Sequence, residues 1–333
     1  MATPTHELIG SPLPAISVIL PVLNEESHLE GAVLSVLSQD YRGPLEIILA
    51  LGPSRDRTNE IAAKLASQDR RVKLLDSPTG KTAAGLNLAL AASNNPVVVR
   101  VDGHAQIPKN YISLIVEILN KTGAVNVGGV MAAVGTTVFE RAVAGAMRSP
   151  LGVGASRFHT GGEAGEVDTV YLGAFRREAL VAIGGFDERF TRAQDWELNF
   201  RLRENGGVIY FDPRSHVTYR PRSSIGALAK QYFEYGRWRR VVSRRHSGTI
   251  NYRYLAPPFA LIGFSASLIL GIALSSIFFI PALVYLLFVV LASLKISTSM
   301  TEYFLLLLVI PTMHFAWGAG FISSPKTLVP ASQ

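Results

Sequence analysis

Residues 96–104 of the chain read PVVVRVDGH. The run 96–101 is apolar apart from Arg100, which is typical of a strand buried on both faces of a sheet. Such strands occur in parallel sheets that helices cover on both sides. Because ligands of these sheets bind at the carboxyl ends of the strands, Asp102 and His104 are candidate site residues.

The segments around this strand alternate between short apolar runs and helical patterns. We expect strands at 16–20, 45–51 and 72–75, and helices at 26–38, 58–65 and 81–91. Thr58 is the expected cap of the second helix. The alternation predicts an α/β domain with a mostly parallel sheet. Polar residues at 24–26, 52–54 and 102–104 follow three of these strands, so they should meet at one edge.

Two nucleotide-binding motifs can be excluded. Gly80, Lys81 and Thr82 resemble the end of a P-loop, but that motif requires glycine at position 75, which is leucine. No GxGxxG sequence follows the first expected strand. The sequence therefore indicates neither ATP hydrolysis nor nicotinamide chemistry.

The C-terminal part of the chain has a different composition. The 333 residues include no cysteine, which excludes a disulfide-stapled domain and a thiolate metal site. Residues 255–333 contain only three charged side chains, namely Lys295, Glu302 and Lys326. Residues 254–294 are long enough for two membrane spans with a break near Ser275 and Ser276 or at Pro281, and 303–323 for a third. The alternative is a hairpin that only dips into the bilayer. For His314, within the third run, we favour packing or a headgroup contact.

A basic cluster precedes these runs. Residues 214–253 contain ten Lys and Arg against one acid, Glu234. At 225–245, aromatic and basic residues alternate, which predicts an interfacial helix on anionic lipid rather than a nucleic-acid surface. The N-terminal residues lack the pattern of a signal peptide. With the positive-inside rule, this predicts a multi-pass cell-membrane protein whose first domain is cytoplasmic.

Two acidic groups could carry chemistry. Asp102 and His104 lie two residues apart, so both can face one divalent metal such as Mn²⁺; alternatively, Asp102 caps the next helix and His104 is a loop residue. Asp195 lies in 194–198, which begin an amphipathic helix. An acid there either complements the helix dipole or serves as a general base, and the spacing does not distinguish the two.

Four motifs together resemble a known family. They are ISVILPVLNEE at 16–26, Asp102-Gly103-His104 in place of DxD, FRREALVAIGGFDE at 175–188, and QDWEL at 194–198. In this order they resemble the family 2 glycosyltransferases, which have the Rossmann-like GT-A fold, and are most similar to the succinoglycan-type exopolysaccharide branch. The resemblance covers about residues 14–250 and predicts five segments: a tail (1–14), a GT-A catalytic domain (15–222), a basic interfacial helix region (223–252), a transmembrane domain with about three helices (253–324) and a second tail (325–333).

The resemblance implies an inverting transfer of a sugar from a UDP- or GDP-linked donor to a lipid-linked or polymeric saccharide at the membrane. Asp195 would be the base, and Asp102 and His104 would hold Mn²⁺ or Mg²⁺. Donor contacts would come from Pro21, Asn24, Glu25, Asp56, Lys81 and Asp102, and acceptor contacts from Gly173, Ala174, Gln231, Arg237 and Trp238. Membrane lipid would be a partner and nucleic acid would not.

The sequence departs from the family pattern at several points. Leu51-Gly52 replace the acidic pair that usually follows the second strand, so recognition of the nucleotide base should differ. Five residues, not two, separate Gln231 from Arg237, so processive synthesis is not expected. Two alternatives stay open: a polyprenyl-phosphate sugar synthase, and a catalytically degenerate sugar-nucleotide-binding subunit. Residues 134–166, rich in Gly and Ala, are either a mobile acceptor loop or a linker.

Overall fold

The computed structural model describes residues 13–329, and these form two compact units. The first contains 13–132 and 161–219, and the second contains 133–160 and 220–329. Residues 133–160 lie within the predicted catalytic segment 15–222 and pack mainly with the second unit.

The first unit is an α/β domain built on one mixed sheet. Within the described residues the sheet has eight strands in the order β3-β2-β1-β4-β7-β5-β8-β6. The four strands β1–β4 pair in parallel, and β7 pairs with β4 and β5 in antiparallel orientation. The strands are β1 (Ile16–Val22), β2 (Leu45–Leu51), β3 (Val72–Asp76), β4 (Val97–Arg100), β5 (Asn126–Ala133), β6 (Gly165–Glu166), β7 (Ala174–Arg176) and β8 (Ile209–Tyr219).

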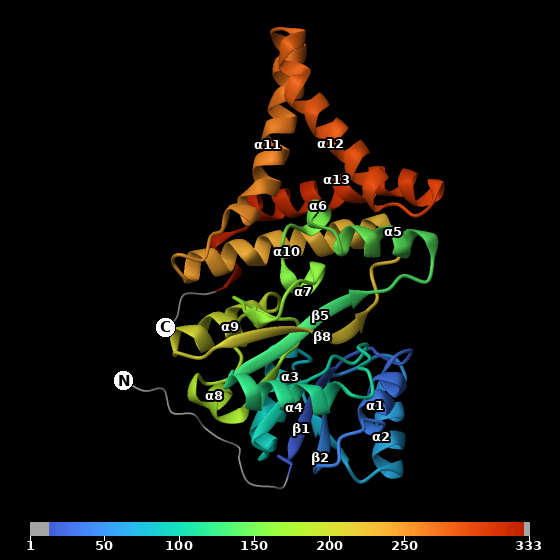
Figure 1. Cartoon of the computed structure of the whole chain (residues 1–333), viewed down its shortest axis with the longest axis vertical. Coiled ribbons are helices and arrows are strands. Elements are labelled where there is room, and N and C mark those ends of the chain that lie inside the picture. Colours follow the sequence, from blue (N-terminus) through green and yellow to red (C-terminus); the bar gives the residue numbers. More distant parts are fainter. Residues whose placement is uncertain (1–12, 330–333) are drawn as a thin grey trace. The chain divides into compact units, whose positions relative to one another are not determined.

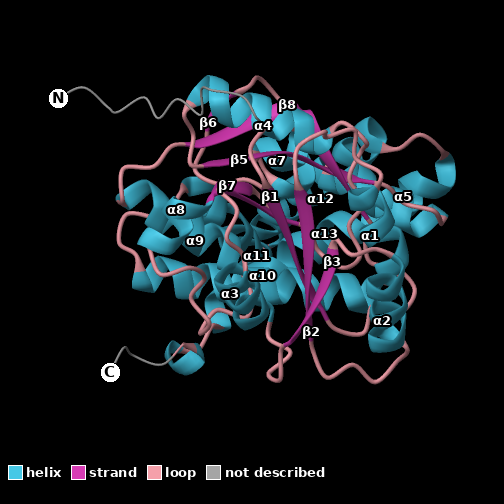
Figure 2. Cartoon of the chain, turned by 90° about the horizontal axis from the view of Figure 1, so that it is seen from below, coloured by secondary structure: helices cyan, strands magenta, loops and turns pink. Residues whose placement is uncertain are grey.

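Helices cover both faces of this sheet, as expected for strands that are apolar on both sides. Alternate residues of β1 divide between two cores: Val18 and Leu20 lie in one, Ile19 in the other. Figure 2 shows α1 and α2 on one side of the strands and α3 on the other. The helices are α1 (Leu29–Leu37), α2 (Thr58–Gln68), α3 (Thr82–Ala92), α4 (Tyr111–Thr122), α8 (Arg177–Ala182) and α9 (Gln194–Glu204).

The strand–helix alternation predicted from the sequence is confirmed, with differences at the boundaries. The first helix begins at Leu29, three residues later than expected. Thr58 is the first residue of α2 rather than its cap, which is Arg57. The Thr58 hydroxyl instead donates to Asp56 Oδ1 at 2.5 Å, so it stabilises the loop that leads into the helix.

The second unit is helical. Residues 133–160 form α5 (Val138–Met147), α6 (Pro150–Val153) and α7 (Arg157–Thr160), so much of the glycine- and alanine-rich stretch is ordered helix. The C-terminal part forms α10 (Ile225–Arg245), α11 (Tyr252–Ala273), η1 (Ser276–Phe279), α12 (Ile280–Ile296), α13 (Met300–Ser323) and η2 (Lys326–Leu328) (Figure 1). Three helical segments, 252–273, 276–296 and 300–323, are long and apolar enough to cross a membrane.

Candidate active site

The carboxyl ends of β1 and β2 are joined by hydrogen bonds between their loops. Asn24, at φ 55°, accepts the Arg55 N–H at 2.8 Å, and the Glu25 N–H donates to Thr58 at 2.7 Å. Asp56 accepts the Glu26 N–H at 3.2 Å. The Thr58 hydroxyl is the main cause that lowers the pKa of Asp56, so this carboxylate stays ionised.

Two predicted donor residues hold these loops together. Asp56 accepts from Glu26 and Thr58 with its two oxygens, so it stabilises the loop. Asn24 accepts the Arg55 N–H with its Oδ1. Pro21 lies near the end of β1, and Lys81 is the exposed N-cap of α3. A Cβ on Gly85 of α3 would be 3.3 Å from the Ala50 Cβ of β2, so this glycine allows the helix to pack closely on the sheet.

Asp102 and Asp195 meet through one arginine. Arg100, the last residue of β4, donates from Nε to Asp102 Oδ1 at 3.0 Å and from a terminal nitrogen to Asp195 Oδ1. The Arg100 side chain is 4% exposed, so the guanidinium is buried between the two carboxylates. The two acids, 93 positions apart in the chain, therefore lie at the same end of β4.

The electrostatics of this acid–arginine–acid cluster favour a charged guanidinium and a weakly acidic Asp195. Burial lowers the pKa of Arg100, but the carboxylates of Asp102 and Asp195 outweigh it and hold the pKa above its ordinary value. Burial raises the pKa of Asp195 to about 6; Arg100 opposes this rise and Asp102 adds to it. A carboxylate that titrates there is mostly ionised at neutral pH yet basic enough to accept a proton.

Helix α9 holds Asp195 in place. Asp195 is its second residue, where the helix dipole favours a carboxylate. Asn199 of the same helix accepts from Asn126 of β5 at 2.6 Å and donates to Thr169 at 2.9 Å, both in the interior. Arg201 donates to the carbonyls of Ile183 and Gly185 at 2.8 Å each. These bonds fix the helix to the sheet and to the glycine-containing loop.

His104 contacts Glu25, which follows the first strand. Its Nδ1 lies 2.7 Å from Glu25 Oε1, and a Cβ on Gly103 would be 3.0 Å from the Glu25 side chain. Glu25 is one of the residues predicted to contact the nucleotide-sugar donor, and its side chain also contacts His104. A carboxylate on one imidazole nitrogen is the usual support of a histidine that binds a metal through the other nitrogen.

The protein side chains near Asp102 can hold a divalent metal only if the substrate supplies further ligands. Among residues 13–329 no group of three or more His, Asp or Glu side chains could hold an ion by itself. Asp102 and His104 supply an oxygen and a nitrogen donor, which suit Mn²⁺, and diphosphate oxygens would fill the remaining positions.

The predicted acceptor residues fall in both units. The Gly173 carbonyl accepts the Arg100 N–H at 3.0 Å, and Ala174 pairs with Val99, so both lie beside the cluster. Gly173 has φ 101°, and a Cβ there would be 2.5 Å from Asn126, so only glycine fits. Gln231, Arg237 and Trp238 lie on α10 of the second unit: Gln231 donates to Tyr235, Arg237 pairs with Glu234, and Trp238 is buried.

Arg100 is the residue that our site prediction omitted. It interrupts an otherwise apolar strand, and a charge buried in a parallel sheet requires an acidic partner. This rule was sufficient to connect Arg100 with an acid, although not to identify Asp195.

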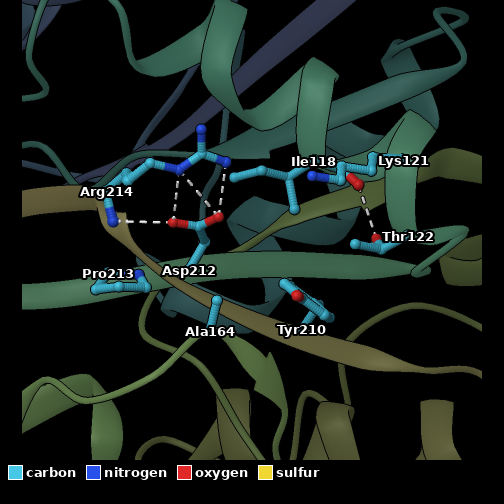
Figure 3. Close-up of a pocket in the computed structure, with 8 residues that line it drawn as sticks. All are labelled: Ile118, Lys121, Thr122, Ala164, Tyr210, Asp212, Pro213 and Arg214. Atoms are coloured by element: carbon cyan, nitrogen blue, oxygen red, sulfur yellow. Dashed lines mark hydrogen bonds and ion pairs between the residues drawn. The ribbon is translucent and has the colours of Figure 1, made fainter.

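A separate pocket of about 320 Å³ contains none of the predicted site residues (Figure 3). Its lining includes Asp212 and Arg214, which form an ion pair at 2.9 Å, and the C-terminal residues Lys121 and Thr122 of α4. Helix α4 follows β4 and runs antiparallel to it. The last residues of α4 therefore lie at the amino ends of the parallel strands, away from Asp102 and Asp195.

The first unit is an α/β domain whose acid–arginine–acid cluster lies at the carboxyl ends of parallel strands, where domains of this class bind ligands. The chain belongs to glycosyl transferase family 2, whose family model matches residues 17–184. It is 34% identical over 254 residues to the succinoglycan biosynthesis protein ExoA of Rhizobium meliloti (strain 1021), covering 75% of this chain and 77% of the relative. The predicted family is therefore confirmed.

Other relatives support the same assignment. A Methanococcus voltae dolichyl N-acetyl-alpha-D-glucosaminyl phosphate 3-beta-D-2,3-diacetamido-2,3-dideoxy-beta-D-glucuronosyltransferase is 24% identical, covering 73% of this chain and 77% of the relative. Mannosyltransferase PcManGT from Pyrobaculum calidifontis, solved with GDP-Man and Mn²⁺, has a TM-score of 0.66 at 21% identity, covering 94% and 88% of the two chains. S. aureus TarS 1-349 with UDP-GlcNAc has a TM-score of 0.52 at 16% identity, covering 90% and 89%. The predicted GT-A-like fold is confirmed.

Proposed function

We propose that this chain is a membrane-anchored inverting glycosyltransferase that moves a sugar from a nucleotide-diphosphate donor to a saccharide hydroxyl. One observation carries the proposal: a single buried guanidinium, Arg100, contacts both Asp102 and Asp195. Two carboxylates held by one guanidinium lie at the same end of β4. This placement suits one residue that acts at the diphosphate and another that acts at the attacking hydroxyl of the same sugar.

In the proposed reaction Asp195 is the general base. The acceptor oxygen attacks the anomeric carbon as the bond from that carbon to the diphosphate oxygen breaks. The hydroxyl proton passes to Asp195, and the electron pair of the broken bond stays on the departing nucleoside diphosphate. Attack in line with the leaving group inverts the configuration at the anomeric carbon.

Asp102 and His104 are the proposed ligands of Mn²⁺ or Mg²⁺. When bound, such a metal would neutralise charge on the diphosphate. Arg100 keeps the Asp102 carboxylate oriented, and Glu25 keeps His104 oriented through its Nδ1. The PcManGT structure with GDP-Man and Mn²⁺ and the TarS structure with UDP-GlcNAc support a nucleotide-sugar donor of the UDP or GDP type.

A lipid-linked or polymeric saccharide is the proposed acceptor. ExoA is named for succinoglycan biosynthesis, and the Methanococcus relative is named for transfer to a dolichyl-phosphate-linked sugar. Both names favour a sugar hydroxyl, which needs a base, over a lipid phosphate, which does not. Arg220, one of the basic residues that could serve a phosphate acceptor, donates to Thr136 Oγ1 at 2.7 Å and lies 3.8 Å from Glu140.

The proposed location is the cytoplasmic face of the cell membrane. The first unit precedes α10, whose basic residues lie next to the apolar helices in the chain. The positive-inside rule assigns such a segment to the cytoplasm.

The test is Asp195→Asn with a matched control, Asp69→Asn. Asp69 also pairs with an arginine, Arg71, at 2.8 Å. It precedes β3, so it lies at the amino ends of the parallel strands rather than at their carboxyl ends. We expect Asp195→Asn to lower kcat by about 10²–10⁴-fold while donor binding persists, since a general base contributes about that factor. Asp69→Asn should retain activity. Full transfer by Asp195→Asn would contradict the assignment.

A further inference from the structure

By length and composition, all three apolar helices of the second unit could cross a membrane. Their packing differs, and the difference bears on which of them cross. The hairpin of α11 and α12 exposes large apolar side chains along its length, such as Ile272 at 82% and Leu283 at 59%. Helix α13 has buried residues from its first turn to its last. They are Glu302, Leu306, Val309, Ile310, Met313, Gly318, Gly320 and Phe321.

The C-terminal half of α13 packs directly on α10 (Figure 1). A Cβ on Gly236 would be 2.0 Å from the Trp317 carbonyl, and a Cβ on Gly320 would be 1.9 Å from the Phe233 carbonyl. Backbones this close require glycine on both helices. Arg244 of α10 also donates to the Ser324 carbonyl at 2.9 Å, just beyond the end of α13.

The N-terminal half of α13 contacts α5. Glu302 accepts from Arg141 of α5 at 3.2 Å, and it also accepts from the Thr298 hydroxyl at 2.6 Å. A Cβ on Gly145 of α5 would be 2.9 Å from the Ile296 side chain, just before α13 begins. Both ends of α13 are therefore bonded to arginines of α5 and α10.

Helix α10 cannot accompany a spanning helix into hydrocarbon. It carries seven charged residues in 21 positions: Lys230, Glu234, Arg237, Arg239, Arg240, Arg244 and Arg245. Charged side chains are strongly disfavoured at the centre of a bilayer. Because α13 is fixed along α10, a position of α13 across the membrane would pull these charges into the core.

The charges that flank the helices agree with this argument. The connection between α11 and α12, residues 274–279, contains no charged residue. Lys295 lies at the end of α12, and Lys326 follows α13. If α13 crossed the membrane, Lys326 would lie opposite the basic face of α10. If it does not, every Lys and Arg of 220–329 lies on one side, which satisfies the positive-inside rule.

We propose that only the α11–α12 hairpin enters the bilayer core and that α13 lies along the membrane surface. One face of α13 then rests on α5 and α10, and the opposite face, with Phe304 at 59% and Leu308 at 62% exposed, contacts acyl chains. Figure 1 shows α11 and α12 rising away from α13. The residues after α13 therefore lie on the same membrane face as the catalytic unit. This inference does not depend on the proposed catalytic roles.

The chain has no cysteine, so a single introduced thiol reports its own location. We would label Ser67→Cys, on α2 of the first unit, and Thr327→Cys, in η2, with a membrane-impermeant maleimide. Right-side-out and inverted membrane vesicles from the expression host would be compared. Both positions are exposed. The proposal predicts that both thiols react in the same vesicle orientation and that neither reacts in the other.

Labelling of the two thiols in opposite orientations would overturn the proposal, because it would show that α13 crosses. Lys326→Cys is a second reporter if Thr327→Cys does not accumulate in membranes. A thiol at Ser276, in the connection of the hairpin, should not react in the orientation that labels Ser67→Cys. Reaction there from the catalytic side would also contradict the inserted hairpin. Retained transfer activity of each variant shows that the thiol has not disturbed the fold.

Discussion

Two regions of this protein depart from ordinary burial in opposite ways. At the catalytic edge of the first unit a charged side chain is buried: Arg100 is 4% exposed. In the α11–α12 hairpin apolar side chains are exposed, with Ile272 at 82%. A buried charge is tolerated when it is paired, and an exposed apolar surface is tolerated when hydrocarbon covers it. Each departure therefore indicates a partner: two carboxylates for the buried guanidinium, and, as we propose, lipid for the exposed apolar hairpin.

The largest expected effect comes from removing the buried charge. Arg100→Leu leaves two carboxylates without their shared partner, which we expect to cost roughly 3–5 kcal/mol of folding free energy. Transfer activity should fall by at least about 100-fold, or ~2.7 kcal/mol in activation free energy. Thermal unfolding and steady-state kinetics measure the two effects.

The control for this substitution is Arg71→Leu. Arg71 also pairs with an acid, but its side chain is 41% exposed. Exposed pairs contribute about 0–1 kcal/mol, so this variant should differ little from the parent protein. Equal losses in the two variants would mean that the Arg100 cluster has no special role.

The second prediction compares two apolar side chains of equal exposure in the two regions. Leu34 of α1 is 51% exposed and Ile262 of α11 is 53% exposed. Ile262→Lys should disfavour membrane insertion by about 3 kcal/mol, since it places a charge in hydrocarbon. Leu34→Lys faces water and should change stability little. Membrane fractionation of the two variants measures the difference, and normal insertion of Ile262→Lys would contradict a lipid-facing α11.

The third prediction sharpens the description of the metal ligands. Glu25→Gln removes the carboxylate next to His104 Nδ1, and loss of such a supporting group typically weakens metal affinity 10–100-fold. Mn²⁺ titration in the presence of the nucleoside diphosphate measures this change. Glu30→Gln is the control, because Glu30 pairs only with the exposed Lys64 at 3.6 Å. Unchanged Mn²⁺ affinity in Glu25→Gln would remove His104 from the proposed ligands.

The smallest expected effect is a pH dependence near neutrality. The pKa of Asp195 is raised to about 6, and a general base must be deprotonated to act. We therefore expect kcat/KM to be constant above about pH 7 and to fall about tenfold per pH unit below 6. Because Arg100 opposes the rise in this pKa, Arg100→Leu should move the fall to higher pH. A profile that stays flat down to pH 5 would exclude Asp195 as the base.

Local patterns were sufficient for the sheet and for one half of the site. The apolar run at 96–101 identified β4, and Asp102 followed because parallel strands present their ligands at their carboxyl ends. The pattern at 194–198 made Asp195 a candidate, but only the family resemblance favoured a base over a helix-dipole acid. Its distance in the chain from Asp102 carries no information on contact. The bond between Glu25 and His104 joins residues 79 positions apart and could not be predicted from spacing.

The helical unit shows the same limit. Hydropathy identified three helices that are long and apolar enough to span a membrane. Hydropathy does not show that Gly236 and Gly320 bring α10 and α13 into backbone contact, nor that Arg141 of α5 pairs with Glu302. Such contacts depend on tertiary packing, which assigned residues 133–160 to this unit.

The central claim is that Asp102 and Asp195 act on the same sugar from opposite sides of its anomeric carbon. The most direct test is an experimental structure of Asp195→Asn with an intact nucleotide-sugar donor and Mn²⁺. We predict that the diphosphate lies at residue 102 and the anomeric carbon between it and the amide of residue 195, above Arg100. A diphosphate bound at another edge of the sheet, or an anomeric carbon out of reach of residue 195, would contradict the account.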